Sequence, residues 1–341
     1  MFYVGLDIHS KVIAVCVLDK DAKVVRQARL RQVDQVVRLL EEIPGRFQLC
    51  FEASCGYGGW FELFTKYATR VVVAHPGHLR LIFRSQRKND RVDAHKLAKL
   101  LVLDLLPAVH VPSADVRAWR ELINYRTKLI GKRTRAKNEI RALLRSLRMA
   151  APKRPGLWTQ RGMAWLKELE LEHRLHRVRL KQLVLEIEYL TEHLREVEAE
   201  LKTFSQDNPA VPLLRTIPGV GLRTAEALVA FIDDPHRFPN AKAVGAYFGL
   251  VPCQDQSAHT NRLGHITREG AAVVRRLVTE AAWQAIRRSP SVAAYFERIG
   301  RGDPDRKKIA LIATAHYLTR VMWGMLKHGT LWKETVSASA T

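Results

Sequence analysis

Residues 2–30, FYVGLDIHSKVIAVCVLDKDAKVVRQARL, decide how the N-terminal part of this chain folds. Three runs rich in apolar and β-branched residues, Phe2–Ile8, Val12–Leu18 and Val24–Leu30, are separated by two short polar segments. Short strands joined by tight turns pair with their neighbours in the chain as an antiparallel meander. The stretch therefore predicts three consecutive antiparallel strands.

The residues that follow predict helices and two more strands of the same domain. The expected elements are a helix over 33–42, a strand over 47–51, a helix over about 59–68 and a strand over 70–74. A meander followed by helix, strand, helix and strand is the order of an α/β domain with a mixed sheet covered by helices.

Four acidic residues lie at the ends of predicted strands or at the start of a predicted helix, and the strand ends are poor places to solvate a carboxylate. Asp7 is near the end of the first strand, Glu52 ends the fourth, and Asp90 and Asp93 begin a helix three residues apart. Singly, each has an ordinary explanation as a turn or helix-start acid. Asp90 and Asp93 share one helix face because they are three residues apart. Together with Asp7 and Glu52 at the ends of two strands, they can form a ribonuclease-H-like arrangement of four carboxylates. Such a set suits two divalent cations, Mg²⁺ or Mn²⁺, in phosphodiester chemistry.

The pattern becomes helical beyond the α/β domain. One helix is expected over 113–149, and a later helix carries apolar residues in steps of three and four from Leu180 to Phe204. This heptad spacing predicts coiled-coil packing against a second copy of the protein or against the first long helix. The apolar seam stops at Asp207-Asn208-Pro209, which marks a domain boundary.

The charge balance indicates a nucleic-acid partner. The chain has 56 Lys and Arg against 34 Asp and Glu, a formal net charge of +22. Binding to a polyanion relieves the repulsion among these positive charges, so nucleic acid is the expected partner. An anionic membrane surface is the weaker alternative. The cations expected to contact phosphates lie beside the carboxylates and along the first long helix: Arg84, Arg87, Lys88, Arg91, Lys128, Arg133, Lys137, Arg141 and Arg145.

The remaining composition argues against a membrane or secreted protein. No uninterrupted apolar run reaches the length of a spanning helix, and the start of the chain lacks a signal-peptide pattern. The four cysteines are scattered, with neither Cys-x-x-Cys nor zinc-ligand spacing. We therefore expect a cytoplasmic protein with reduced thiols and no membrane partner.

The C-terminal part contains two motifs of interest. Residues 217–221, IPGVG, predict a helix-hairpin-helix turn in which Gly219 and Gly221 let the backbone approach phosphates. A purely structural turn between two helices is the competing interpretation. Farther on, residues 252–264 are expected to form a polar loop between two helices, which is where function tends to reside.

The motifs taken together resemble a known family. They are, in chain order, GLDIHS (5–10), FEAS (51–54), KNDRVDA (88–94), TIPGVG (216–221), AYFGLVP (246–252), QS (256–257) and GHITREG (264–270). This order is similar to insertion-sequence transposases with a DEDD catalytic set. The group is related to the Piv-type DNA invertases and described as bridge-RNA-guided recombinases.

The resemblance implies an organisation and a chemistry. The expected parts are a RuvC-like, RNase H-like α/β domain (1–110), a helical coiled-coil linker (111–207), a mostly α-helical C-terminal transposase domain (208–336) and a disordered tail (337–341). It further implies metal binding by the four carboxylates and a nucleophilic Ser257, although Ala258 follows where the family commonly has glycine. The implied partners are donor and target DNA, a structured noncoding guide RNA, and further copies of the protein in a dimer or tetramer.

Two other functions are compatible with these residues. A RuvC-like Holliday-junction resolvase would use metal-activated water, with Ser257 incidental to the reaction. A nucleic-acid-binding scaffold would account for the charge and the heptad seam. It would not account for acids placed at strand ends.

Overall fold

The computed structural model describes the whole chain except residues 55, 83–89, 153, 155, 258–259 and 335–341, and it does not describe the side chains of Asp90, Arg91 and Asn261. The chain forms two compact units, Met1–Arg117 and Ala118–Thr341. The boundaries expected at residues 110 and 207 stay predictions, and the tail over 337–341 lies outside the described residues.

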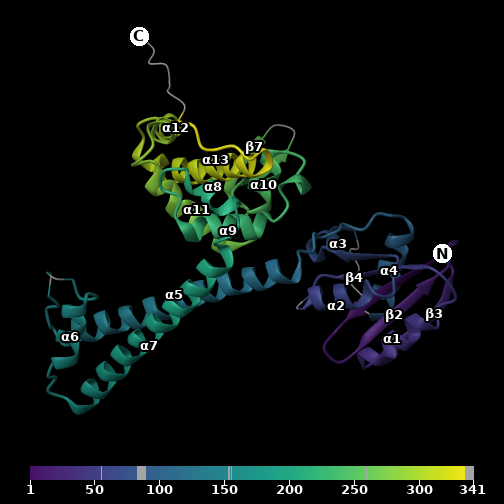
Figure 1. Cartoon of the computed structure of the whole chain (residues 1–341), viewed down its shortest axis with the longest axis horizontal. Coiled ribbons are helices and arrows are strands. Elements are labelled where there is room, and N and C mark those ends of the chain that lie inside the picture. Colours follow the sequence, from purple (N-terminus) through teal and green to yellow (C-terminus); the bar gives the residue numbers. More distant parts are fainter. Residues whose placement is uncertain (55, 83–89, 153, 155, 258–259, 335–341) are drawn as a thin grey trace, which may run out of the picture. The chain divides into compact units, whose positions relative to one another are not determined.

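The first unit is built on a five-stranded mixed sheet (Figure 1). Its strands are β1 (Phe2–Ile8), β2 (Ile13–Leu18), β3 (Val24–Leu30), β4 (Phe47–Glu52) and β5 (Arg70–Ala74), in the order β3-β2-β1-β4-β5. The predicted meander is confirmed, because β2 pairs antiparallel with both β1 and β3. β4 runs parallel to β1 and to β5, as strands connected through helices do.

Helices cover both faces of this sheet. Those of the first unit are α1 (Val33–Glu41), α2 (Tyr57–Phe64), α3 (Pro76–Ile82) and α4 (Asp90–Val102). α1 and α2 pack on the face that carries Val4, Leu6 and Phe51. α4 packs on the other face, beside Cys16 and Cys50. The sheet is therefore enclosed, and polar side chains are left for its edges and strand ends.

Gly5 brings α4 unusually close to the sheet. A Cβ at this position would lie 2.2 Å from the carbonyl oxygen of Ala94 and 2.6 Å from the nitrogen of Ala98. Only a residue without a side chain lets the helix backbone rest on β1 in this way. The glycine of the GLDIHS motif thus sets the height of α4 above the strand that carries Asp7.

Two long helices lie side by side, α5 (Ala114–Ser146), most of which belongs to the second unit, and α7 (Arg174–Ser205) (Figure 1). They run antiparallel, because Arg126 of α5 donates to Glu198 of α7 at 2.7 Å, whereas Arg179 of α7 pairs with Glu139 of α5 at 3.6 Å.

The heptad seam of α7 is buried against α5 of the same chain. Leu190 and Leu194 pack on Leu129, and the N-terminal part of the seam packs on Ala136 and Ile140. Of the two partners that the sequence left open, the helix of the same chain covers the seam. An interface between copies built on these leucines is therefore wrong, while coiled-coil geometry itself stays a prediction.

The rest of the second unit is mostly helical. Its elements are α6 (Gln160–Glu168), α8 (Ala210–Arg215), α9 (Leu222–Ile232), η1 (Pro235–Arg237), α10 (Ala241–Tyr247), β6 (Pro252–Ser257), β7 (Thr260–Ile266), α11 (Ala272–Ala285), α12 (Pro290–Gly300), η2 (Pro304–Arg306) and α13 (Lys307–His328). α9 lies at the centre, with every side chain from Thr224 to Ile232 buried. Glu226 in this helix is satisfied by Arg223 and by the Ser205 hydroxyl, each at 2.7 Å.

One helix among the described residues is long and apolar enough to span a bilayer by length and composition alone. It covers Pro304–His328, and 44% of its most apolar window is buried inside the protein. It contains no uninterrupted apolar run of spanning length, because Lys307, Lys308 and Arg320 interrupt the segment. α13 packs in the main core through Leu318 and Met322, as the central helix of a helical domain does.

Candidate active site

Asp7 and Glu52 stand side by side at the carboxyl ends of two neighbouring parallel strands. Leu6 of β1 lies opposite Phe51 of β4, so the next residue in each strand is one of the two acids. Side chains alternate along a strand, so Asp7 is on the same face as Gly5, the face that α4 covers. Glu52 is two residues beyond Cys50, which packs against α4, so it is on this face too.

α4 brings its N-terminus to the same end of the sheet. Gly5 lies under Ala94 and Ala98, whereas Tyr3 also packs against a cluster that contains Leu100 and Leu101, nearer the other end of the helix. α4 therefore runs antiparallel to β1, and its first turn, which contains Asp93, lies toward Asp7. The helix begins at Asp90, as predicted, and the side chain of this residue is outside the described part.

Two of the carboxylates, Asp7 and Asp93, already have partners within the protein. Asp7 is only 8% exposed, and its Oδ2 lies 3.2 Å from Nε2 of the exposed His9. The Lys96 ammonium donates to Asp93 Oδ1 at 3.1 Å. A buried carboxylate must be paired or hydrogen-bonded, and these contacts meet that requirement. Among the side chains that the structure describes, no three His, Cys, Asp or Glu residues form a cluster that could hold a metal ion.

The predicted phosphate-contacting cations divide into three groups. Arg84, Arg87, Lys88 and the side chain of Arg91 lie outside the described residues. Lys128, Arg141 and Arg145 of α5 are exposed. Arg133 and Lys137 are half-buried and turn toward α7 and Trp158, respectively. The basic residues of α5 therefore pass from solvent into a pocket, rather than forming one open stripe.

Ser257 lies on a two-stranded antiparallel ribbon, not on the loop that the sequence predicted. β6 ends at Ser257 and β7 begins at Thr260, and these residues form the last pair of the ribbon. The two hydroxyl oxygens are 2.6 Å apart, and every residue of β6 is exposed. Because neither face of β6 is buried, the sequence has no apolar alternation that would have predicted a strand.

The base of the ribbon is joined by two motif glycines. Gly249 (φ +63°) and Gly270 (φ +64°) have left-handed backbone conformations. A Cβ at Gly249 would lie 2.3 Å from the Glu269 nitrogen, and one at Gly270 would lie 2.0 Å from the Tyr247 carbonyl oxygen. The AYFGLVP and GHITREG motifs are thus the two ends of one ribbon, in direct backbone contact.

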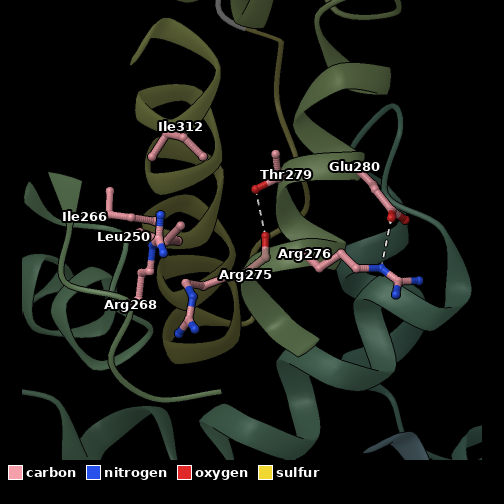
Figure 2. A pocket seen from close by; sticks show the side chains of 8 residues that line it. All are labelled: Leu250, Ile266, Arg268, Arg275, Arg276, Thr279, Glu280 and Ile312. Carbon is pink, nitrogen blue, oxygen red and sulfur yellow. Dashed lines mark hydrogen bonds and ion pairs between the residues drawn. The ribbon is translucent and has the colours of Figure 1, made fainter. Parts of the chain in front are cut away.

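Arg275 holds these two ends together, a role that sequence reasoning missed. Its Nη1 donates to the carbonyl oxygens of Phe248 at 3.1 Å and Gly270 at 3.2 Å, and also to that of Glu269. Burial lowers the pKa of Arg275, and the positive charge of Arg268 lowers it further. Figure 2 shows both residues at the rim of a pocket of about 310 Å³. The only sequence signal for this role was the Arg275-Arg276 pair. The pair alone does not predict the role, because the carbonyl groups that Arg275 binds include that of Phe248, which is distant in sequence.

The IPGVG turn joins α8 to α9, as a helix-hairpin-helix turn would. Gly219 has φ +94°, and a Cβ there would lie 2.5 Å from the backbone nitrogen of Ala285 in α11. Packing within the protein thus explains this glycine. A Cβ at Gly221 would meet nothing within 4 Å. Phosphate contact by the turn stays a prediction. Of the two glycines, Gly221 is the one beside which a phosphate would find open space.

Comparisons with known proteins give two family matches. Residues 4–149 match a DEDD transposase family, and residues 211–297 match the transposase IS116/IS110/IS902 family. The transposase for insertion sequence element IS1111A of Coxiella burnetii is 27% identical over 94% of this chain and 88% of its own length. The transposase for insertion sequence element IS1328 of Yersinia enterocolitica is 25% identical over 97% of this chain and 98% of its own length.

The first match spans the four carboxylates and the second spans Ser257. The chain is therefore a transposase, an enzyme of DNA strand transfer. It belongs to the IS110/IS116 family of insertion-sequence transposases.

Proposed function

We propose that this transposase cuts and rejoins DNA strands with a divalent-metal carboxylate site and a serine nucleophile. The observation that carries the proposal is the pair Asp7 and Glu52, in register on parallel strands under the first turn of α4. Placing two acids at neighbouring strand ends in an enclosed sheet costs solvation, which a metal-binding role would explain. The sheet order and the helices on both faces support an RNase H-like, RuvC-like fold for this unit.

The donor set suits hard divalent cations. Carboxylate oxygens of Asp7, Glu52, Asp90 and Asp93 would hold Mg²⁺ or Mn²⁺, which prefer oxygen ligands. Such ions, when bound, stabilise charge on the attacking and leaving oxygens of a phosphodiester displacement. The protein's own part is to orient the acids: His9 contacts Asp7, and Lys96 holds Asp93.

Ser257 is the proposed nucleophile. Its oxygen bonds to a DNA phosphorus, the bond from that phosphorus to one sugar oxygen breaks, and the departing oxygen takes up the serine proton. Attack by a sugar hydroxyl of the other DNA partner then rejoins the strand and restores the serine. An exposed position at the end of a ribbon gives a DNA strand access to this hydroxyl. A β-ribbon is also an element that enters DNA grooves in other proteins.

Donor and target DNA are the proposed substrates, with a structured noncoding RNA as guide. The +22 net charge and the basic residues of α5 support a polyanionic partner. The guide RNA rests on the family resemblance rather than on any single residue. A cytoplasmic location with no membrane partner accords with α13 packing in the protein core.

Self-association is proposed through a second apolar stripe of α7. The stripe is exposed and has heptad spacing: Leu175 (66% exposed), Val178 (50%), Leu185 (47%) and Tyr189 (61%). Residues 174–181 carry four cations and no acid, whereas residues 186–200 carry six acids and one arginine. Two antiparallel copies of α7 would place the basic half of one against the acidic half of the other. We infer that a second copy covers this stripe, in a dimer or in a tetramer of two dimers.

Replacing Leu185 and Tyr189 together with lysine should separate the copies, because charge would enter the proposed interface. Light scattering of the full chain on and off DNA measures the change. Leu190→Lys is the contrasting variant: it puts charge into the seam that α5 covers, so it should lower the melting temperature instead. Assembly of the double variant at the wild-type mass would rule the stripe out as the interface.

The products of the reaction test the function itself. A recombinase leaves donor and target strands joined, whereas a resolvase that uses water leaves free ends. Incubating the protein with plasmids that carry the element's ends and a target, in Mg²⁺, should yield joined strands. Sequencing across the junctions reads the result. Free ends with no joined product would favour the RuvC-like resolvase, and neither product would favour a binding scaffold.

A further inference from the structure

A pocket of about 430 Å³ lies between α5, α6 and α7, away from the carboxylates and from Ser257 in the sequence. Its lining is rich in cations, with Arg133 and Lys137 from α5, Lys167 from α6 and Arg195 from α7. The apolar side chains of Met163 and Ile187 also line the pocket. The volume is within the range of small-ligand sites and is too small for a nucleic-acid duplex.

The cations of this pocket outnumber its acids. Glu188 lines the pocket and pairs with Lys167 at 2.6 Å, and Arg195 pairs with Glu192 at 2.6 Å. Among the described residues, neither Arg133 nor Lys137 forms an ion pair with a carboxylate. Arg133 contacts the Thr191 hydroxyl at 3.4 Å. Two cations thus face the pocket without a counter-charge.

Lys137 is held in this unfavourable position by its neighbours. Its ammonium lies 5.1 Å from the centre of the Trp158 ring, as does the Arg141 guanidinium. Burial lowers the pKa of Lys137, and the charges of Arg133 and Arg141 lower it further. An anion in the pocket would relieve this crowding, and cations already held on a ring lose little freedom on binding.

Trp158, which lines the pocket, also has an unpaired hydrogen-bond donor. The Nε1 atom of Trp158 is buried, and within the described part of the chain it has no partner. Buried polar atoms of native proteins are almost always paired, so this donor is one of the few unsatisfied buried groups among the described residues.

We propose that this pocket binds one nucleotide of a single-stranded nucleic-acid segment, with its phosphate on Arg133 and Lys137 and its base against Met163 and Ile187. The proposal rests on the nucleic-acid partners proposed above and gives one of them a specific site. Proteins bind single strands by combining a cationic track for the backbone with apolar or aromatic surfaces for the bases. RNA and DNA strands share this chemistry, and the experiment separates them.

The test uses the full chain and fluorescently labelled short single strands, RNA and DNA of the same sequence, with duplex DNA as a third probe. Lys137→Gln should weaken single-strand binding about tenfold or more in anisotropy titrations, because a charge-assisted contact is lost. Lys132→Gln is the matched control. It removes the same charge from an exposed position on the same helix, and binding should stay within about twofold of wild type.

A variant that fills the pocket distinguishes binding in the pocket from general electrostatic attraction to the basic surface. Ala164 lines the pocket and is exposed, so Ala164→Trp should occupy the space without changing charge or unfolding α6. Single-strand binding should fall about tenfold, and duplex binding should not change. A larger loss for the RNA probe assigns the site to RNA, and a larger loss for the DNA probe assigns it to DNA.

Two results would overturn the proposal: wild-type single-strand affinity in folded Ala164→Trp protein, or equal losses for Lys132→Gln and Lys137→Gln. Circular dichroism verifies folding of each variant. Because binding is measured without strand exchange, failure of the pocket leaves the Ser257 chemistry untouched. Equally, Ser257→Ala protein should bind the single strands as the wild type does, whether or not the proposed chemistry holds.

Discussion

Ser257→Ala should bind RNA and DNA as the wild type does and yet reduce strand exchange by roughly a thousandfold or more, because removing a nucleophile removes the covalent step. Wild-type protein stopped with denaturant should carry DNA on a phosphoserine bond, which mass spectrometry of the digested adduct can place on Ser257. The alanine variant should show no adduct. Ser257→Cys should retain weak activity because a thiol can form the same bond.

Thr260→Val is the control that changes a neighbouring hydroxyl and leaves the proposed nucleophile in place. The Thr260 hydroxyl is the described partner of Ser257, at 2.6 Å, so its loss removes a hydrogen bond but leaves the nucleophile. Adduct formation should persist in this variant, at a reduced rate. If Ser257→Ala exchanges strands at the wild-type rate, or if no denaturant-stable adduct forms on wild-type protein, attack by water becomes the better mechanism.

Asp7→Asn should abolish strand exchange while leaving the fold and DNA binding intact. The amide keeps the shape of the buried side chain but removes the negative charge that a divalent ion requires. Metal ions contribute several kcal/mol of transition-state stabilisation, which corresponds to a loss of about a thousandfold or more. Strand exchange across a Mg²⁺ and Mn²⁺ titration, with calorimetry of metal binding, measures both consequences.

Asp34→Asn provides the matched control, because Asp34 is an exposed acid on α1, which covers the opposite face of the sheet. Its activity should equal that of the wild type. Glu52→Gln and Asp93→Asn should behave like Asp7→Asn if the carboxylates act as one set. Full activity in folded Asp7→Asn protein would remove the carboxylate site from the mechanism.

The sequence determined the strands and α1 of the first unit almost to the residue, whereas α2 begins two and ends four residues earlier than expected and α3 was not expected. β1, β3 and β5 have the predicted bounds, and β2, β4 and α1 differ by a single residue. These strands are buried short runs separated by polar turns, and the periodicity of their side chains is local information. Placing Asp7 and Glu52 at strand ends followed from the same bounds. The parallel register that puts them side by side follows from β4 joining β1.

Only the tertiary structure showed which elements of the second unit pack against one another. The heptad pattern of α7 predicted an apolar partner helix, but a second copy of the protein and α5 of the same chain offer the same kind of side chain. In the structure, α5 covers the heptad seam of α7. The Ser257 ribbon had no apolar alternation, since its strand β6 is exposed on both faces, and it depends on backbone contacts at Gly249, Gly270 and Arg275. The pocket at Lys137 likewise needs three helices at once. Periodicity reports which face of an element is apolar, whereas the identity of the neighbour depends on contacts between distant residues.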